Sequence, residues 1–182
     1  MIRIIGFSGK YGSGKTTLAK EFASDIKAKF ISFGDYIRDL AKERNQNHED
    51  RDVLRDIGEE QINRGWSTFC QSVLDFYEYR GEKLLVVDGV RHLGCLDGFR
   101  MILQDPAIYV VYIDVSETLS QERQRSRGES KIYTYTGNLH MTEEQVVTAI
   151  PLVANLIMDG NKDLSELKTQ LNVWYAEYVT NC

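Results

Sequence analysis

The feature that most constrains this chain is a glycine-rich turn, Gly9-Lys-Tyr-Gly-Ser-Gly-Lys-Thr16. It fits the pattern GxxxxGK[ST] at every position. The apolar, β-branched residues 2–7 before it predict a strand, and residues 15–26 after it predict a helix. A strand that turns through glycines into a helix aims several backbone N–H groups at one point, where the helix N-terminus also favours an anion. The segment therefore predicts a site for the phosphates of a nucleotide.

The residue types in this turn indicate which nucleotide and which metal ion. Gly9, Gly12 and Gly14 can adopt positive φ and carry no Cβ that would keep a phosphate away. Lys15 can reach the β- and γ-phosphates of ATP, and the Thr16 hydroxyl is placed to bind Mg²⁺. A dinucleotide-binding turn is a poorer match, because it needs GxGxxG and no Lys-Thr. We expect ATP and Mg²⁺ as cofactors, with nucleotide contacts from Gly9, Gly12, Ser13, Gly14, Lys15, Thr16 and Thr17.

Strand and helix patterns alternate along the rest of the chain. Further strands are expected at 30–33, 84–87, 109–113 and 156–158, and helices at 35–44, 52–63, 68–79, 93–103, 117–127 and 142–149. An apolar stripe of Leu164, Leu167, Leu171, Trp174 and Tyr178 predicts a last helix. Residues 128–141 show no periodicity and are expected to form an exposed loop. The alternation predicts an α/β fold with a mostly parallel, five-stranded sheet flanked by helices, and 182 residues suit a single domain.

Composition limits the possible partners. The net charge is −5, and the chain has no basic stripe, which argues against nucleic acid as a partner. Its apolar runs are too short to span a bilayer, and its three cysteines include no CxxC. We therefore expect a cytoplasmic protein with reduced thiols and no membrane partner. The sequence leaves open whether it is a monomer or a homodimer.

Four more segments carry candidate site residues. In Val86-Val-Asp-Gly-Val-Arg91, Asp88 ends a buried strand, a position suited to a magnesium ligand. In Ser32-Phe-Gly-Asp-Tyr-Ile-Arg38, Asp35 and Arg38 share a helix face. Arg123 and Arg127 are four residues apart at the end of another predicted helix. Residues 154–163 form a strand-to-helix turn with Gly160 and Asn161. The ordinary alternatives are a helix cap for Asp35, a turn residue for Asp88 and solvated surface charges for the arginines.

Together these segments resemble the nucleoside-monophosphate kinase group of P-loop phosphotransferases, and within it dephospho-CoA kinases and phage deoxynucleoside-monophosphate kinases. The resemblance implies that Arg38 and Arg91 bind the acceptor's phosphate and that Asp35 orients the acceptor or joins the metal shell. It implies a lid at about 124–142, from which Arg123 and Arg127 close over the γ-phosphoryl group, and acceptor-side helices at about 35–80. The backbone at Gly160 and Asn161 would contact adenine. The extended lid and zinc-ligand cysteines of adenylate kinases are missing, and His140 with Glu143 is interpreted as a helix start rather than a catalytic pair.

The implied function is transfer of the γ-phosphoryl group of ATP to a small phosphorylated acceptor, first of all a (deoxy)nucleoside monophosphate. The alternatives are a dephospho-CoA kinase-like activity and a regulatory module that binds ATP without transferring phosphate. A GTPase is disfavoured because Asn161-Lys-Asp163 is one residue short of Asn-Lys-x-Asp. A motor-type AAA ATPase is disfavoured because 182 residues leave no room for its helical lid domain.

Overall fold

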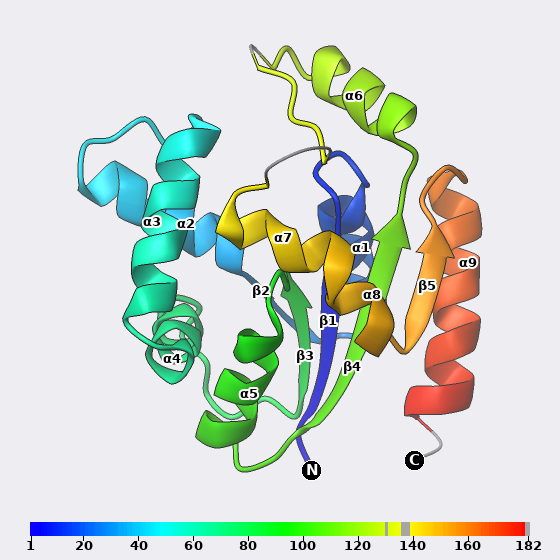
Figure 1. Ribbon diagram of the computed structural model, residues 1–182. Helices are drawn as coiled ribbons and strands as arrows, with labels where there is room; N and C mark the ends of the chain where they lie inside the picture. Colours follow the sequence, from blue (N-terminus) through cyan, green and yellow to red (C-terminus); the bar gives the residue numbers. More distant parts are fainter. Residues whose placement is uncertain (130, 136–138, 181–182) are drawn as a thin grey trace.

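The computed structural model describes residues 1–129, 131–135 and 139–180. A five-stranded parallel sheet lies at its centre, with the strand order β2-β3-β1-β4-β5 (Figure 1). The strands are β1 (Arg3–Gly9), β2 (Lys29–Ser32), β3 (Leu84–Asp88), β4 (Ala107–Asp114) and β5 (Leu156–Asp159). The predicted α/β fold with five strands is thereby confirmed, and every strand pair in the sheet is parallel.

Helices cover both faces of the sheet and create two apolar cores. The first core lies under α1 (Lys15–Asp25) and α9 (Leu164–Trp174). The second contains residues from α2 (Phe33–Glu43), α3 (Arg51–Asn63), α4 (Trp66–Phe76), α5 (Leu93–Ile102), α7 (Met141–Thr148) and α8 (Ile150–Val153). The central strands β1 and β3 are buried along most of their length, which explains why their sequences are almost continuously apolar.

The chain order brings the predicted site residues to one edge of the sheet. β1 and β3 are neighbours, and Phe7, next to the glycine turn, is paired with Asp88. Because all strands run in the same direction, the segments that follow β1, β2, β3, β4 and β5 meet at the carboxyl edge. The helix α6 (Glu117–Ser126) leaves β4 at this edge, above the end of the sheet in Figure 1.

The sequence predicted an exposed loop at 128–141, and the described residues around Tyr133 differ from this. Tyr133 is buried, and its backbone N–H and C=O groups both bind the side chain of Gln124 in α6, at 2.8 and 3.0 Å. The amide side chain of Gln124 thus satisfies both backbone groups of Tyr133 and holds this residue in place without a helix or strand. Because the residues around Tyr133 form no regular structure, their sequence shows no periodicity. Residues 130 and 136–138 of the predicted lid lie outside the described residues.

The predicted stripe on the last helix is wrong at both ends, and at its start Leu164 is exposed. Leu167, Leu171 and Trp174 are buried as expected, but Tyr178 is exposed and Val179 is buried instead. The reason is a π-helical turn, Tyr175–Val179, which follows α9. An i→i+5 turn inserts one extra residue, so the buried face shifts along the sequence by one position.

Among the described residues, no helix combines the length and the apolar character that crossing a bilayer requires.

Candidate active site

The glycine turn adopts a conformation that other residues would resist. Gly9, Gly12 and Gly14 have φ angles of 145°, 81° and 87°. A Cβ on Gly9 would lie 2.5 Å from the carbonyl oxygen of Ile113, and one on Gly12 would lie 2.8 Å from that of Ser120. The first two glycines are therefore required by space as well as by conformation, because the loop lies against the ends of β4 and α6.

Lys15 begins α1 and is buried at the mouth of the turn. Its ammonium group lies 3.4 Å from the carbonyl oxygen of Lys10, on the other side of the loop. In the described part of the chain no carboxylate lies within ion-pair distance of it. Burial, with a further contribution from Arg91, lowers the pKa of Lys15 to about 8. A buried cation without an anionic partner is well suited to receive phosphate oxygens.

Asp88 lies beside the first turn of α1, where the sequence places a magnesium ligand. Its Oδ2 atom accepts hydrogen bonds from Thr16 Oγ1 at 2.8 Å and from Ser32 Oγ at 3.4 Å. Its Oδ1 atom is buried and has no hydrogen-bond partner. A buried carboxylate oxygen without a partner is costly unless something binds there. The two hydroxyl groups and the free oxygen form a hard, oxygen-only donor set, which fits Mg²⁺.

A cavity opens beside Gly89, the residue after Asp88, between the sheet edge and helices α2, α3 and α4. Its apolar wall includes Phe33, Ile37, Leu54, Ile62, Trp66 and Phe69. Its polar rim includes Arg38, Arg51, Arg55, Arg91, His92, Thr142 and Glu143. The cavity thus combines an aromatic wall, which suits a flat ring, with four guanidinium groups, which suit a phosphate.

Three of these arginines converge on one buried carboxylate, that of Glu143 in α7. Arg91 donates to Glu143 Oε1, Arg51 Nη2 lies 2.5 Å from the same oxygen, and Arg55 Nε lies 3.8 Å from it. The Tyr135 hydroxyl donates to Oε2 at 2.8 Å. Although burial alone would raise the pKa of Glu143, Arg91 and Arg51 lower it to about 2. The carboxylate is therefore ionised, and it leaves an excess of positive charge around the cavity.

Asp35 and Arg38 face each other as the sequence suggested. Arg38 Nη1 donates to Asp35 Oδ1 at 3.2 Å, and the Tyr77 hydroxyl donates to Asp35 Oδ2 at 3.2 Å. The helix cap is Ser32, whose hydroxyl accepts from the Asp35 backbone N–H, so the capping alternative for Asp35 is wrong. Arg38 lines the cavity, whereas Asp35 is not among its lining residues. The roles expected for the two side chains stay predictions.

The predicted lid arginines lie on the opposite side of the glycine turn. Arg123 donates to the carbonyl oxygens of Gly12, Ser13 and Gly160, each at 3.2 Å. Arg127 is paired with Glu129 at 3.5 Å. Both arginines line a second, open cavity together with Gly12, Ser13, Gly14, Thr17, Ser126, Lys162, Leu164 and Leu167. Their expected action on the γ-phosphoryl group stays a prediction.

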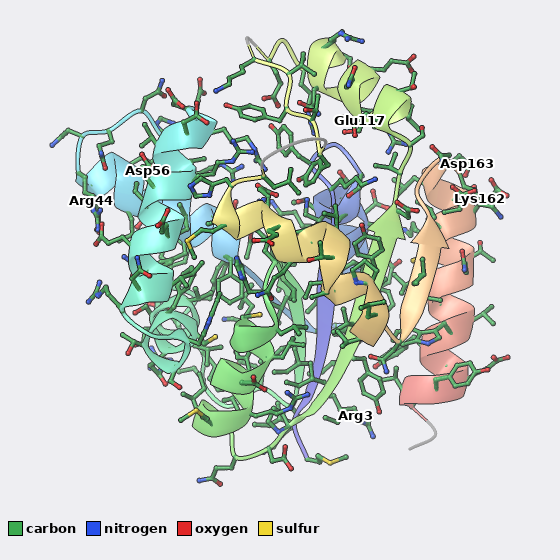
Figure 2. The ribbon with its side chains drawn as sticks, viewed as in Figure 1. Arg3, Arg44, Asp56, Glu117, Lys162 and Asp163 are labelled. Carbon is green, nitrogen blue, oxygen red and sulfur yellow. The ribbon has the colours of Figure 1, made fainter. Side chains whose placement is uncertain are left out.

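The turn between β5 and α9, predicted to contact adenine, borders this second cavity. Asn161 Oδ1 accepts from the Ser116 backbone N–H at 3.1 Å, which ties the turn to the start of α6. A Cβ on Gly160 would lie 2.8 Å from the carbonyl oxygen of Asp114, so the turn packs tightly against β4. Figure 2 labels Glu117, Lys162 and Asp163, which mark the start of α6 and this turn. The contact with adenine expected at Gly160 and Asn161 stays a prediction.

The sequence interpretation missed Arg51, Arg55 and Glu143. Arg51 and Arg55 are four residues apart on one helix, and the same spacing had singled out Arg123 and Arg127, so a signal was present. Glu143 was noticed only beside His140, which caps α7 by accepting from the Thr142 backbone N–H at 3.3 Å. The helix start was therefore predicted correctly. Only the fold shows that α7 carries Glu143 to arginines 52 and 92 residues away in the sequence.

The parallel sheet, the glycine turn between β1 and α1, the aspartate at the end of β3 and the arginine-lined cavity define a P-loop kinase. Residues 8–135 match the sequence model of the family described as "AAA domain", and the chain belongs to this family.

Known proteins similar to this chain are also kinases. The adenylate kinase of Rickettsia prowazekii (strain Madrid E) is 26% identical over 183 residues, which cover 96% of this chain and 82% of the relative. The shikimate kinase of Aquifex aeolicus vf5 has a TM-score of 0.59 at 13% identity, covering 98% of this chain and 99% of its own. The shikimate kinase of Acinetobacter baumannii, solved in complex with shikimate, has a TM-score of 0.57 at 16% identity, covering 99% of this chain and 96% of its own. The structures show a shared fold, and together these likenesses confirm the resemblance to the nucleoside-monophosphate kinase group.

Proposed function

We propose that this protein transfers the γ-phosphoryl group of ATP to a small phosphorylated acceptor, first of all a ribo- or deoxyribonucleoside monophosphate. The observation that carries the proposal is the cavity beside Gly89, in which Arg51, Arg55 and Arg91 surround a single carboxylate. The excess positive charge suits the phosphate of an acceptor, and the aromatic wall of Trp66 and Phe69 suits a nucleobase.

The reaction needs positioning and charge neutralisation more than covalent chemistry from the protein. An oxygen of the acceptor's phosphate attacks the γ-phosphorus, the bond to the β–γ bridging oxygen breaks, and ADP leaves with both electrons of that bond. The loop amides and Lys15 hold the donor phosphates, and Arg38 and Arg91 hold the acceptor's phosphate. Thr16 and Asp88 are the residues that would hold Mg²⁺, which supplies charge neutralisation at the β- and γ-phosphates.

The proposal extends to the organisation of the domain. Helices α2, α3 and α4 lie within residues 33–76 and contribute most of the cavity's apolar wall. This supports the interpretation of residues 35–80 as the acceptor-side region. Residues 124–142 would act as a short lid, in which the Tyr135 hydroxyl accepts from the Tyr11 N–H of the glycine turn and donates to Glu143 of α7. Its closure would exclude water from the γ-phosphoryl group and so limit wasteful hydrolysis of ATP.

The test is ADP release coupled to an indicator reaction, with ATP, Mg²⁺ and a panel of acceptors. The panel contains the common ribo- and deoxyribonucleoside monophosphates, dephospho-CoA and shikimate. We expect one class of nucleoside monophosphate to raise turnover well above the rate without acceptor. The rate should be lost in Lys15→Ala and kept in Lys168→Ala, a lysine on the surface of α9. Tight ATP binding without stimulation by any acceptor would contradict the proposal and favour a regulatory module.

A further inference from the structure

The third residue of the P-loop pattern is a tyrosine whose backbone and hydroxyl are tied to the lid side of the site. The Tyr11 backbone N–H donates to the Tyr135 hydroxyl at 2.8 Å, and the Ser120 hydroxyl donates to the Tyr11 carbonyl at 2.7 Å. The Tyr11 hydroxyl donates to the Glu129 carboxylate. Three hydrogen bonds therefore fix the tip of the loop to α6 and to the segment that follows it.

The aromatic ring of Tyr11 lies under two guanidinium groups from different parts of the site. The Cζ atom of Arg51 is 3.9 Å from the ring centroid, and that of Arg127 is 5.0 Å from it. Both distances are within the range in which a cation is attracted to an aromatic face. Arg51 begins α3 on the acceptor side, and Arg127 ends α6 on the lid side. Tyr11 is thus a single residue of the nucleotide loop that contacts an arginine from each of the two neighbouring regions.

Arg51 has the contacts expected of a positioned group. Glu143 holds one side of its guanidinium at 2.5 Å, and the Tyr11 ring covers it at 3.9 Å. Its Nε atom is buried and has no hydrogen-bond partner, so Glu143 and the Tyr11 ring supply the contacts that orient the guanidinium. Tyr135 joins the two supports, because its hydroxyl accepts from the Tyr11 N–H and donates to Glu143.

We propose that Tyr11 is a positioning residue that holds Arg51 and Arg127 at the phosphoryl-transfer site through its aromatic ring. The proposal rests on the proposed function in taking the cavity beside Gly89 as the acceptor site. Tyr11 acts through the two arginines. The orientations of Arg51 on the acceptor side and of Arg127 on the lid side therefore depend on the same aromatic ring. Tyr11 thereby couples the two regions at the nucleotide loop.

Two substitutions separate the ring from the hydroxyl. Tyr11→Phe keeps the ring and loses the bond to Glu129, whereas Tyr11→Leu keeps much of the apolar volume and loses the aromatic face. We expect kcat of Tyr11→Phe to stay within about twofold of the parent, and kcat of Tyr11→Leu to fall about tenfold, equivalent to about 1.4 kcal/mol. The KM for the acceptor should rise several-fold in Tyr11→Leu. The KM for ATP should change by less than about twofold, because the loop amides are retained. Tyr178→Ala, on the exposed π-helical turn, is the control.

A double-mutant cycle tests whether the ring acts through Arg51. In an Arg51→Gln background, Tyr11→Leu should cost much less than tenfold, because the guanidinium that the ring positions is already gone. Full additivity of the two substitutions would overturn the proposal. Equal losses in Tyr11→Phe and Tyr11→Leu would also overturn it, since the hydroxyl and not the ring would then be responsible.

A binding measurement separates failure of this inference from failure of the proposed function. Inorganic phosphate is titrated calorimetrically into the enzyme saturated with ADP, as a probe that does not require the acceptor to be known. We expect its Kd to rise about tenfold in Tyr11→Leu and to stay within about twofold of the parent in Tyr11→Phe. If no acceptor in the panel is phosphorylated but phosphate binding follows this pattern, only the proposed function fails. If phosphate binding is unchanged in Tyr11→Leu, the positioning role of Tyr11 is refuted.

Discussion

Glu143→Gln is the substitution for which the structure predicts the largest effect on stability. Glu143 is 1% exposed, and its carboxylate lies within ion-pair distance of Arg51, Arg55 and Arg91, of which Arg55 also pairs with Asp52. The glutamine has nearly the same shape but no charge, so it would leave the partly buried guanidinium groups of Arg51 and Arg91 without this anionic partner. Removing one member of a buried ion pair typically costs 3–5 kcal/mol.

The pKa of Glu143 provides a second estimate. Its fall from the usual 4.5 to about 2 corresponds to roughly 3 kcal/mol of stability at neutral pH. Because the pKa is lower in the folded state, this stabilisation is complete above about pH 4.5 and is lost as the pH falls towards 2. The two estimates agree, and for a chain of this length they correspond to a fall in Tm of roughly 10 °C.

The assay is unfolding by denaturant at a series of pH values from 7 down to about 3. We expect Glu143→Gln to be less stable than the parent by about 3 kcal/mol at pH 7, and the difference to shrink steadily below pH 4.5. Comparing the two proteins at each pH cancels the contributions of the other carboxylates. Glu144→Gln is a matched control, because Glu144 lies in the same turn of α7 and is exposed. A loss below about 0.5 kcal/mol at pH 7, or a difference independent of pH, would refute the reasoning.

Three further predictions concern the loop, the metal site and the cavity wall. Asp88→Asn should lower kcat by at least about a hundredfold, and a higher Mg²⁺ concentration should restore kcat only in part. Steady-state rates measured at a series of Mg²⁺ concentrations test this. If the dependence of the rate on Mg²⁺ were the same as in the parent, Asp88 would not be a metal ligand. Gly9→Ala should destabilise the fold by about 2 kcal/mol or more, because its Cβ would lie 2.5 Å from the Ile113 carbonyl oxygen. Gly81→Ala, at a positive φ of 94° but with no atom within 4 Å of the new Cβ, should cost only about 1 kcal/mol. Equal losses in the two denaturant titrations would show that space at Gly9 is unimportant. Gly94→Ala would place a Cβ 2.1 Å from Trp66 Nε1, so it should displace the indole from the cavity wall. The displacement should change the tryptophan fluorescence and raise the KM for the acceptor. An unaltered emission spectrum would contradict this.

The nucleotide side of the site was predicted from local sequence, because its physics is local. The turn from Gly9 to Thr16 needs glycines at fixed positions, and its strand and helix are its immediate neighbours. Asp88 was recognisable because it ends an apolar run, and the pairing of β1 with β3 puts it beside Thr16. Arg91, three residues further on, was predicted from the same stretch and does line the cavity.

The acceptor side depends on contacts between residues far apart in the chain, and the sequence did not reveal them. Arg51 meets Glu143 across 92 positions, and Tyr11 meets Tyr135 across 124. A buried carboxylate among arginines has the same residue types as a solvated charged helix, so composition and spacing cannot tell the two apart. Burial and convergence distinguish them, since the pKa of Glu143 falls only when α7 brings its carboxylate to Arg51 and Arg91. The sequence by itself determined a nucleotide-binding α/β domain and its phosphate loop, because strand, turn and helix patterns are encoded by neighbouring residues. Only the tertiary structure decided which charges meet around the cavity lined by α2, α3 and α4, because that depends on how helices far apart in the chain pack against one sheet edge.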